Sequence, residues 1–256
     1  MIDETSPYCF VIMSFSEALD TQNAYADGIR AAVESLGIPC IRVDESHFQG
    51  RITERIVDLI KSAYFVVADL SEEKPNCYYE CGYAHAFGKV ILPVIRKGHR
   101  IHFDLHDLPF IVYETPDELA RKLRERIVRV VLTTRGKKSG RDPRKCEFGR
   151  CAVDLERGRL LTATIIPSDS GDYECDISLE VRPLPGSPPI EGTVTFYLPD
   201  EYEPNYYNTR ARKGVARWPV EAHNAFTVGA VADKRATRLE LDLVQIPGGT
   251  PRFYAP

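Results

Sequence analysis

The sequence predicts an α/β domain built on a parallel sheet, followed by an all-β, immunoglobulin-like sandwich. Three observations carry this prediction. Buried-strand patterns alternate with helical patterns up to residue 132, the apolar period becomes two after residue 150, and a basic, breaker-rich stretch separates the two regions. The 256 residues can form two cores. We expect domains over 1–134 and 147–256, with a linker over 135–146.

The pattern of the first region predicts repeated strand–helix units. Residues 8–14 form a nearly continuous apolar run, typical of a strand covered on both faces. Helical periodicity follows up to Leu36, and Gly37 stands where a left-handed C-cap is expected. Alternation of this kind implies right-handed crossovers and a parallel sheet. The further elements expected are strands at 38–43, 64–70 and 90–95 and helices at 52–60 and 77–88.

The first domain ends with a fifth strand and a closing helix. Residues 109–113 are the strand, and residues 115–118 (TPDE) form a capping box with proline at the first helical position. The helix should run to about Leu132. The polar, basic residues 135–145 that follow are typical of a solvated hinge, with a binding patch as the alternative.

The second region is predicted to contain strands with one solvent-exposed face. About six are expected, separated by clusters of Pro, Gly, Asn and Asp: 160–166, 176–182, 193–198, 214–220, 226–231 and 238–243. We assign Trp218, Phe196 and Phe226 to the sandwich core, with an aromatic ligand cage as the alternative. The region offers no catalytic constellation, so binding or assembly is its expected role.

Charge and composition exclude several classes of protein. A net charge of −4 gives no bulk attraction for nucleic acid or an anionic membrane. The longest apolar runs are far too short to span a bilayer, and the N-terminus is no signal peptide, so a cytoplasmic location is expected. Seven cysteines without a CxxC pair indicate reduced thiols.

Glu80 is the leading catalytic candidate. Ligands of open parallel sheets bind beyond the carboxyl ends of the strands, and the helix at 77–87 in that region is almost wholly apolar except for this carboxylate. If Asn76 is the N-cap, the helix dipole favours an ionised Glu80. Such a carboxylate can act as a nucleophile or stabilise an oxocarbenium ion. The alternative is that it only complements the dipole.

Other candidates surround Glu80 in this scheme. Asp69, at the end of a strand, is the expected second carboxylate, with a turn-forming role as the alternative. Ser14 could bind a phosphate through its hydroxyl or a backbone N–H, and Phe15 could stack on a base. The alternative is that both residues only pack at the end of a strand. Asn76 and Tyr79 are weaker candidates for substrate binding. No GxGxxG or GxxxxGK[ST] motif occurs at these turns, which disfavours hydride transfer and ATP hydrolysis.

We expect no metal and no cofactor. Three histidines and two aspartates are interleaved over residues 99–107, but their spacing matches no standard zinc pattern. Cys77 and Cys81 share a helix face and are interpreted as core thiols rather than a site.

Three ordered motifs resemble the nucleoside 2-deoxyribosyltransferase-like branch of the TIR-like domains: residues 9–15 (CFVIMSF), 68–70 (ADL) and 75–89 (PNCYYECGYAHAFGK). The resemblance implies a flavodoxin-like sheet and a catalytic role for Glu80, the glutamate of the E-x-G-Y-A-x-x-x-G-K stretch. Cys77 and Cys81 stand where that family usually carries aliphatic residues. Residues 176–184, 192–198 and 225–233 resemble the prokaryotic YEATS-like module.

The resemblance implies cleavage of the bond between ribose and base in a nucleotide. NAD is the favoured substrate, by similarity to TIR-like effectors of bacterial antiviral defence, and such domains are commonly active only when neighbouring copies complete each other's sites. We therefore expect a small-molecule nucleotide as partner and a homo-oligomer, with a further protein or small-molecule ligand for the second domain. The alternatives are deoxyribosyl transfer between bases and a non-catalytic nucleotide-binding scaffold.

Overall fold

The computed structural model describes residues 7–16, 19–45, 52–102, 105, 108–133, 148, 151–169 and 173–255. The chain divides into two compact units, whose main segments are Tyr8–Ile127 and Val128–Pro256. The expected linker at 135–146 lies outside the described residues, so its boundaries stay a prediction.

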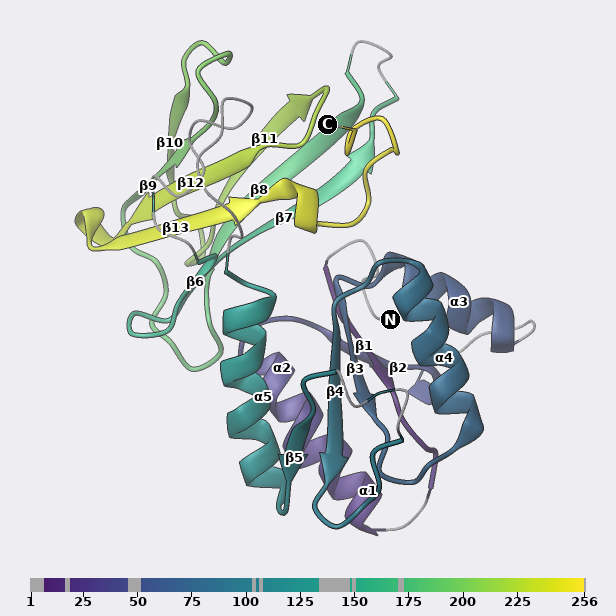
Figure 1. Cartoon of the computed structure of the whole chain (residues 1–256). Coiled ribbons are helices and arrows are strands. Elements are labelled where there is room, and N and C mark those ends of the chain that lie inside the picture. The colour runs from purple at the N-terminus through teal and green to yellow at the C-terminus, as the bar shows by residue number, and fades with distance from the viewer. Residues whose placement is uncertain are drawn as a thin grey trace. The chain divides into compact units, whose positions relative to one another are not determined.

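Unit 1 is built on a five-stranded sheet in which every neighbouring pair of strands is parallel (Figure 1). The strand order is β2-β1-β3-β4-β5, the flavodoxin-like order. All five expected strands are confirmed, several with shorter ends than expected: β1 (Cys9–Ile12), β2 (Cys40–Arg42), β3 (Phe65–Asp69), β4 (Ile91–Arg96) and β5 (Ile111–Tyr113). The chain turns from one side of β1 to the other, so the topological switch point lies between β1 and β3.

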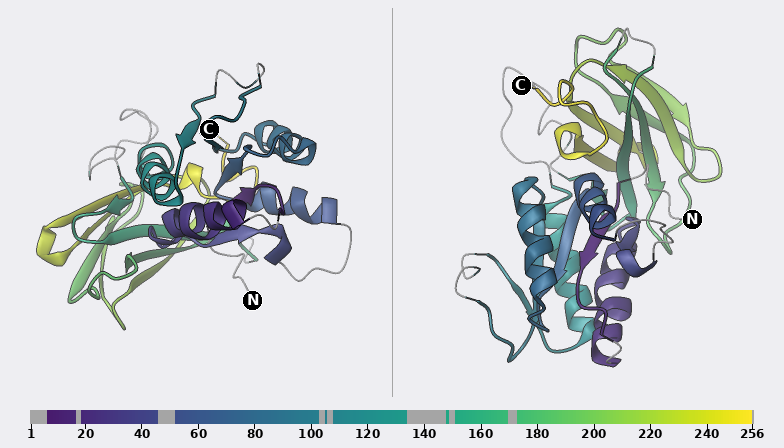
Figure 2. Two further views of the ribbon diagram at one scale, coloured as in Figure 1. Left: turned by 90° about the horizontal axis from the view of Figure 1, so that it is seen from below. Right: turned by 90° about the vertical axis from the view of Figure 1, so that its right-hand side faces the viewer.

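Helices cover both faces of this sheet (Figures 1 and 2). The first is continuous but has a π-helical middle: α1 (Leu19–Asn23), η1 (Ala24–Arg30) and α2 (Ala31–Glu34). It shares a face with α5 (Pro116–Val130), while α3 (Ile52–Ser62) and α4 (Pro75–Ala86) cover the other face. A short 3-10 turn, η2 (Val43–Glu45), follows β2. The predicted helices are confirmed, and Gly37 has the expected positive φ of 70°.

Close packing of η1 on α5 depends on Gly28. A Cβ at this position would lie 2.8 Å from Cδ2 of Leu119, closer than carbon atoms approach. The start of α5 is capped as predicted, since Oγ1 of Thr115 accepts a hydrogen bond from the Glu118 amide at 3.2 Å. The carboxylate of Glu118 reaches back to the Glu114 amide at 2.8 Å.

The core under α3 and α4 fixes the two helices near the switch point. Phe10 and Ile12 of β1 and Val66 and Ala68 of β3 are buried against apolar side chains of α3 and α4. Burial on this scale holds the first turns of α4 beside the loop that follows β1. The residues of the candidate site are therefore placed by rigid elements.

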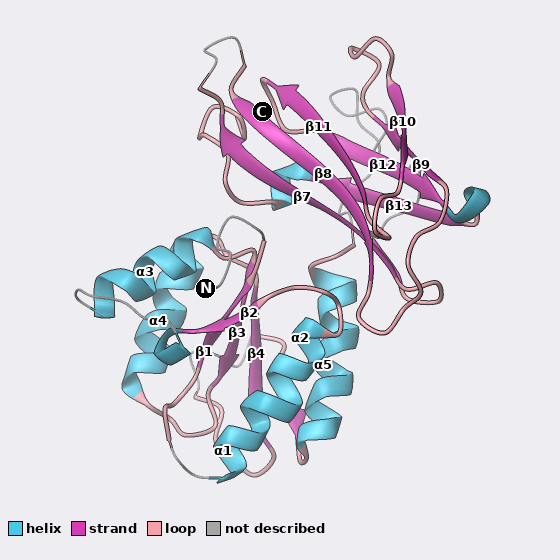
Figure 3. Cartoon of the chain, turned by 180° about the vertical axis from the view of Figure 1, so that it is seen from behind, coloured by secondary structure: helices cyan, strands magenta, loops and turns pink. Residues whose placement is uncertain are grey.

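Unit 2 consists of two four-stranded antiparallel sheets, with orders β10-β9-β12-β13 and β11-β8-β7-β6 (Figure 3). The six expected strands are confirmed: β7 (Arg159–Pro167), β8 (Cys175–Pro183), β9 (Thr193–Tyr197), β11 (Ala216–Ala222), β12 (Thr227–Ala232) and β13 (Thr237–Asp242). Two more, β6 (Val153–Asp154) and β10 (Tyr206–Arg210), were not predicted. Short 3-10 turns, η4 (Asp233–Arg235) and η5 (Leu243–Gln245), flank β13. The immunoglobulin-like and YEATS-like assignments stay predictions.

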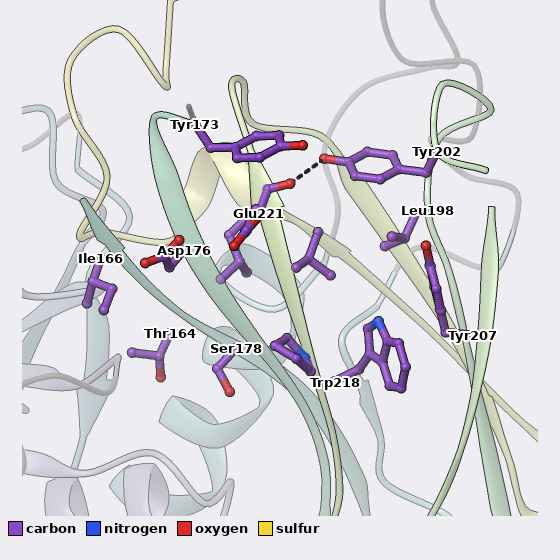
Figure 4. Close-up of a pocket in the computed structure, with 13 residues that line it drawn as sticks. Thr164, Ile166, Tyr173, Asp176, Ser178, Leu198, Tyr202, Tyr207, Trp218 and Glu221 are labelled. Atoms are coloured by element: carbon purple, nitrogen blue, oxygen red, sulfur yellow. Dashed lines mark hydrogen bonds between the residues drawn. The ribbon is translucent and has the colours of Figure 1, made fainter. Parts of the chain in front are cut away.

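The aromatic core of unit 2 differs in one residue from the prediction. Phe196 and Phe226 are buried as expected. Trp218 is only half-buried, so it lies at the margin of the core and not in its interior. It lies on β11, an edge strand, on the same face as the buried Ala216 and Val220, and its ring stacks on Tyr207 of β10 in the other sheet with centroids 4.7 Å apart (Figure 4).

In the part of the chain that the structure describes, no helix is long and apolar enough to cross a membrane. The six described cysteines are free thiols, as expected, and Cys146 lies outside the described residues.

Candidate active site

A pocket of about 450 Å³ opens at the switch point of the unit 1 sheet. It brings together five of the six predicted site residues, Ser14 and Phe15 after β1 and Asn76, Tyr79 and Glu80 on α4. Its remaining described lining consists of Met13, Thr53, Ile56, Val57, Lys74, Pro75, Cys77 and Tyr83. The rule that ligands bind beyond the carboxyl ends of parallel strands, called here the carboxyl-edge rule, therefore pointed to the edge of the sheet at which this pocket opens.

Glu80 is half-buried in this pocket, and removal from water raises the pKa of its carboxyl to about 7. We expected the helix dipole to favour an ionised Glu80, but burial raises the pKa of this carboxyl instead. Helix α4 begins at Pro75 with Lys74 as its N-cap, so Asn76 lies inside the helix and is not the cap. Glu80 consequently lies in the second turn, where the dipole has weakened and desolvation dominates.

The protonation of Glu80 suits it to chemistry at neutral pH. With a pKa near 7, about half of the molecules carry the carboxylate and half the acid. A group of this kind can act as a base or nucleophile in one step and as an acid in another.

Aromatic rings form the mouth of the pocket. Phe15 is 54% exposed and Tyr79 is 59% exposed, which is unusual for large apolar side chains. Tyr79 meets Tyr83 edge to face with centroids 4.9 Å apart, and their hydroxyl oxygens lie 3.0 Å apart. Rings held in this way offer faces on which a planar base can stack.

Asp69 is not in this pocket. It is buried at the end of β3 and lines a neighbouring pocket of about 210 Å³. Its Oδ1 accepts hydrogen bonds from the amide and hydroxyl of Ser71 at 2.9 and 2.6 Å, and its Oδ2 accepts one from the Tyr113 hydroxyl at 2.8 Å. The carboxylate therefore shapes the turn between β3 and α4, which is the alternative role that the sequence left open.

Ser14 lines both pockets, and Glu72 lines the smaller one beside it. Burial opposes the ionisation of Glu72, but this effect is outweighed by hydrogen bonds and by a nearby positive charge. The pKa of Glu72 is therefore lowered, by hydrogen bonds from Thr21, Ser14 and Ser16 and by the charge of Lys74. The Thr21 hydroxyl donates to Glu72 at 2.6 Å. Glu72 is therefore the firmly ionised carboxylate of this edge, and sequence reasoning missed it.

Other lining residues were missed as well. Thr53, Ile56 and Val57 reach the pocket from α3, and Lys74 reaches it from the turn before α4. The carboxyl-edge rule points only to loops that follow strands, so it could not indicate a contribution from the middle of a neighbouring helix. The apolar periodicity of α3 was the available signal, and it was interpreted only as core packing.

The histidines and cysteines considered as alternatives have other partners. His99 contacts the carbonyl oxygen of Ser71 through Nδ1 at 2.6 Å, whereas His102 pairs with Glu73 at 3.3 Å. The described residues contain no group of three metal-ligating side chains, and Asp104, His106 and Asp107 lie outside them.

The two thiols on α4 stay protonated at neutral pH. Burial and the nearby Glu80 raise the pKa of Cys77 to about 12, and burial with Cys77 and Glu80 raises that of Cys81 to about 12. Neither is a nucleophile under these conditions.

No protein-family model and no curated protein matches the chain. Among solved structures, it is similar to the CMP N-glycosidase BcmB of Clostridium botulinum, with 20% identity over 45% of this chain and 97% of that chain and a TM-score of 0.36. A 2-deoxyribosyltransferase from Leishmania mexicana aligns at 20% identity over 46% and 97%, with a TM-score of 0.37. β-Glucosidase 3B of Thermotoga neapolitana aligns at 12% identity over 94% and 51%, with a TM-score of 0.30. Structural similarities this weak do not assign a function to this chain.

Proposed function

We propose that unit 1 cleaves the N-glycosidic bond of a nucleotide and that Glu80 is the catalytic carboxylate. The observation that carries the proposal is the placement of Glu80. It lies half-buried in a pocket at the switch point, with a pKa near 7 and with exposed aromatic rings at the mouth. The motif resemblance, which aligns a catalytic glutamate with this position, supports the same role.

The chemistry follows from charge. As the bond between the anomeric carbon and the base nitrogen breaks, its electron pair leaves with the base and positive charge develops on the sugar. The ionised form of Glu80 stabilises this charge or bonds to the anomeric carbon. Water then supplies a hydroxyl to that carbon and releases a proton to solvent or to Glu80. Phe15 and Tyr79 hold the base by stacking.

NAD+ is the substrate that we propose within this class. Glu80 is the only carboxylic acid among the described residues lining the pocket, and Asp69 lies in the neighbouring pocket, where it accepts three hydrogen bonds. Within the described lining, the pocket therefore offers no second carboxylic acid to protonate a departing base. Nicotinamide needs no such proton, because its ring nitrogen is already cationic in NAD+ and becomes neutral on leaving. Depletion of NAD+ as an antiviral-defence response is the biological role proposed on the basis of the resemblance.

Incubation of the full chain with NAD+, deoxynucleosides and nucleoside monophosphates, followed by chromatography of the released bases, tests the proposal. We expect free nicotinamide from NAD+ at a rate far above the spontaneous one. A second base added in excess distinguishes transfer from hydrolysis, since a transferase would form a new nucleoside. Saturable nucleotide binding without release of any base would instead identify a non-catalytic scaffold and refute the proposed activity.

A further inference from the structure

Unit 1 contains a second cavity, of about 730 Å³, between α4, β4 and the segment that follows β4. A volume of this size is typical of small-molecule sites. The residues that α4 contributes have the spacing of one helical stripe: Tyr78, Cys81, Gly82 and His85. Glu80 is two positions from the nearest of them, about 200° round the helix, and so lies on the opposite face. The two cavities share only Pro75 among their described lining residues.

Gly82 leaves this cavity open. It lies inside α4, where glycine weakens a helix relative to alanine. Gly28 is required by the close approach of Leu119, but a Cβ at Gly82 would have no described atom within 4 Å. Packing therefore does not require a glycine at this position. A larger side chain here would extend from α4 into the cavity and reduce its volume.

Apolar side chains form much of the cavity wall. Tyr78, Cys81 and Ile91 pack against the core under α4 but are only half-buried. Leu105 and Leu108, in the segment after β4, are half-buried as well. A ligand in the cavity would remove the remaining apolar surface of these side chains from water, which favours binding.

Lys89 brings a positive charge to one end of the cavity. Its amide donates to the Ala84 carbonyl oxygen at 2.9 Å, which fixes the residue at the C-terminal end of α4. Its Nζ donates to the Ala63 carbonyl oxygen at 2.8 Å. An ammonium group has three donors, and among the described residues the Lys89 side chain has no second partner. Two of its donors are therefore available to a ligand.

No described carboxylate compensates this charge. Burial lowers the pKa of Lys89, and no acidic neighbour raises it again. Glu73, the only acidic residue in the described lining, pairs with His102 at 3.3 Å. It precedes α4, whereas Lys89 follows it, and the twelve residues of this helix span about 18 Å. The cavity thus combines an apolar wall with a half-buried cation that lacks a counter-charge.

We propose that this cavity binds a small organic anion, a carboxylate carried on an apolar chain. The carboxylate pairs with the ammonium group of Lys89 and accepts a further hydrogen bond from His85. The chain lies along α4, over Gly82 and toward Tyr78. Residues 78 and 85 are about 10 Å apart along the helix axis, a span comparable to an extended octanoate ion. The proposal is independent of the chemistry assigned to Glu80.

Calorimetric titration of the full-length protein at pH 7 measures the binding. The probe is sodium octanoate. Octan-1-ol has the same chain without the charge, and octylammonium chloride reverses the charge. We expect saturable binding of octanoate at a dissociation constant about tenfold or more below those of the other two ligands, because only the carboxylate forms charge-assisted hydrogen bonds with Lys89.

Two variants locate the site. Lys89→Met keeps an unbranched apolar stem but removes the charge, so octanoate binding should weaken about tenfold while octan-1-ol binding is unchanged. Gly82→Leu fills the cavity and removes a glycine that weakens α4, so octanoate binding should be lost while the melting temperature is kept or raised.

Each variant has a matched control. Lys61→Met removes the charge of an exposed lysine outside the cavity, and Gly82→Ala strengthens the helix while adding only a Cβ. Both should bind octanoate nearly as well as the wild-type protein. A loss of binding in Gly82→Leu at an unchanged or higher melting temperature therefore cannot be attributed to unfolding.

Three results would overturn the proposal. The first is a neutral or cationic ligand that binds as tightly as octanoate, which would make the cavity merely apolar. The second is the absence of saturable octanoate binding. The third is wild-type octanoate binding by folded Gly82→Leu or Lys89→Met protein, which would place the anion elsewhere on the molecule.

Discussion

Desolvation sets the protonation of Glu80, the residue on which the proposed chemistry depends. Helix α4 holds the side chain in a pocket whose wall is partly apolar, so the neutral acid is favoured and the pKa rises to about 7. In the unfolded chain the same group ionises near its ordinary value of 4.5. Between pH 4.5 and pH 7, Glu80 therefore keeps its proton in the folded state and loses it in the unfolded state.

Glu80→Gln should consequently stabilise the fold in a pH-dependent way. Above pH 7 the wild-type protein bears the full cost of a half-buried carboxylate, and the variant does not. The full shift corresponds to about 3 kcal/mol, which partial exposure reduces to about 1–2 kcal/mol. We expect this gain in unfolding free energy at pH 8 and almost none near pH 4.5, measured by urea denaturation. An equal difference at both pH values would show that the ionisation of Glu80 is not the cause.

The sequence predicted which residues gather at the site better than it predicted their roles. Ser14, Phe15, Asn76, Tyr79 and Glu80 share one pocket because strand ends and helix starts meet at a switch point, which periodicity reveals. One of the hydrogen bonds that Asp69 accepts comes from Tyr113, 44 residues away. A contact between such distant residues leaves no local pattern in the sequence.

At the scale of elements, a buried ion pair ties the start of β7 to η4 in unit 2. Arg159 is 5% exposed and donates from Nε and Nη2 to the two oxygens of Asp233, at 2.9 and 3.2 Å. The Thr237 hydroxyl adds a bond of 2.8 Å to the same carboxylate. Burial opposes the charge, but these partners lower the pKa of Asp233.

Asp233→Ala should destabilise unit 2 by about 3–5 kcal/mol at pH 7, because it leaves the Arg159 guanidinium buried without its counter-charge. Since the Asp233 pKa is lowered by folding, its contribution is present above the ordinary aspartate value and is lost as the pH falls below it. Chemical denaturation measures the change, with Asp169→Ala as the exposed control. Equal stability of the two variants would show that the ion pair contributes nothing.

Edge strands explain what periodicity failed to predict in unit 2. Strand β10 has the sequence YYNTR, none of its residues is fully buried, and it pairs only with β9. A strand without a buried face produces no apolar alternation, so nothing in the sequence separated it from a loop. Strand β6 has two residues, too few to show any period.

At the scale of the whole molecule, the exposed aromatic mouth of the candidate site bears on assembly. Phe15 and Tyr79 are more than half exposed, so a nucleotide bound there by one copy of the chain would stay in contact with water. A loop from a second copy would exclude water and orient the substrate. We therefore keep the homo-oligomer as a proposal.

Dilution of the full-length protein tests this assembly. Specific activity should fall as the protein is diluted through the dissociation constant of the oligomer, while light scattering reports the loss of mass over the same range. A specific activity that stays constant over a thousandfold dilution would show that each copy acts alone.

The central claim is that Glu80 performs the chemistry, and the rate of base release by Glu80→Gln tests it most directly. The amide keeps the size of the side chain but cannot carry the negative charge that opposes a developing oxocarbenium ion. With Glu125→Gln as a surface control, we expect the turnover of the Glu80 variant to fall about 10³-fold or more while its circular dichroism stays unchanged. A correctly folded Glu80→Gln protein that releases base at nearly the wild-type rate would contradict the account.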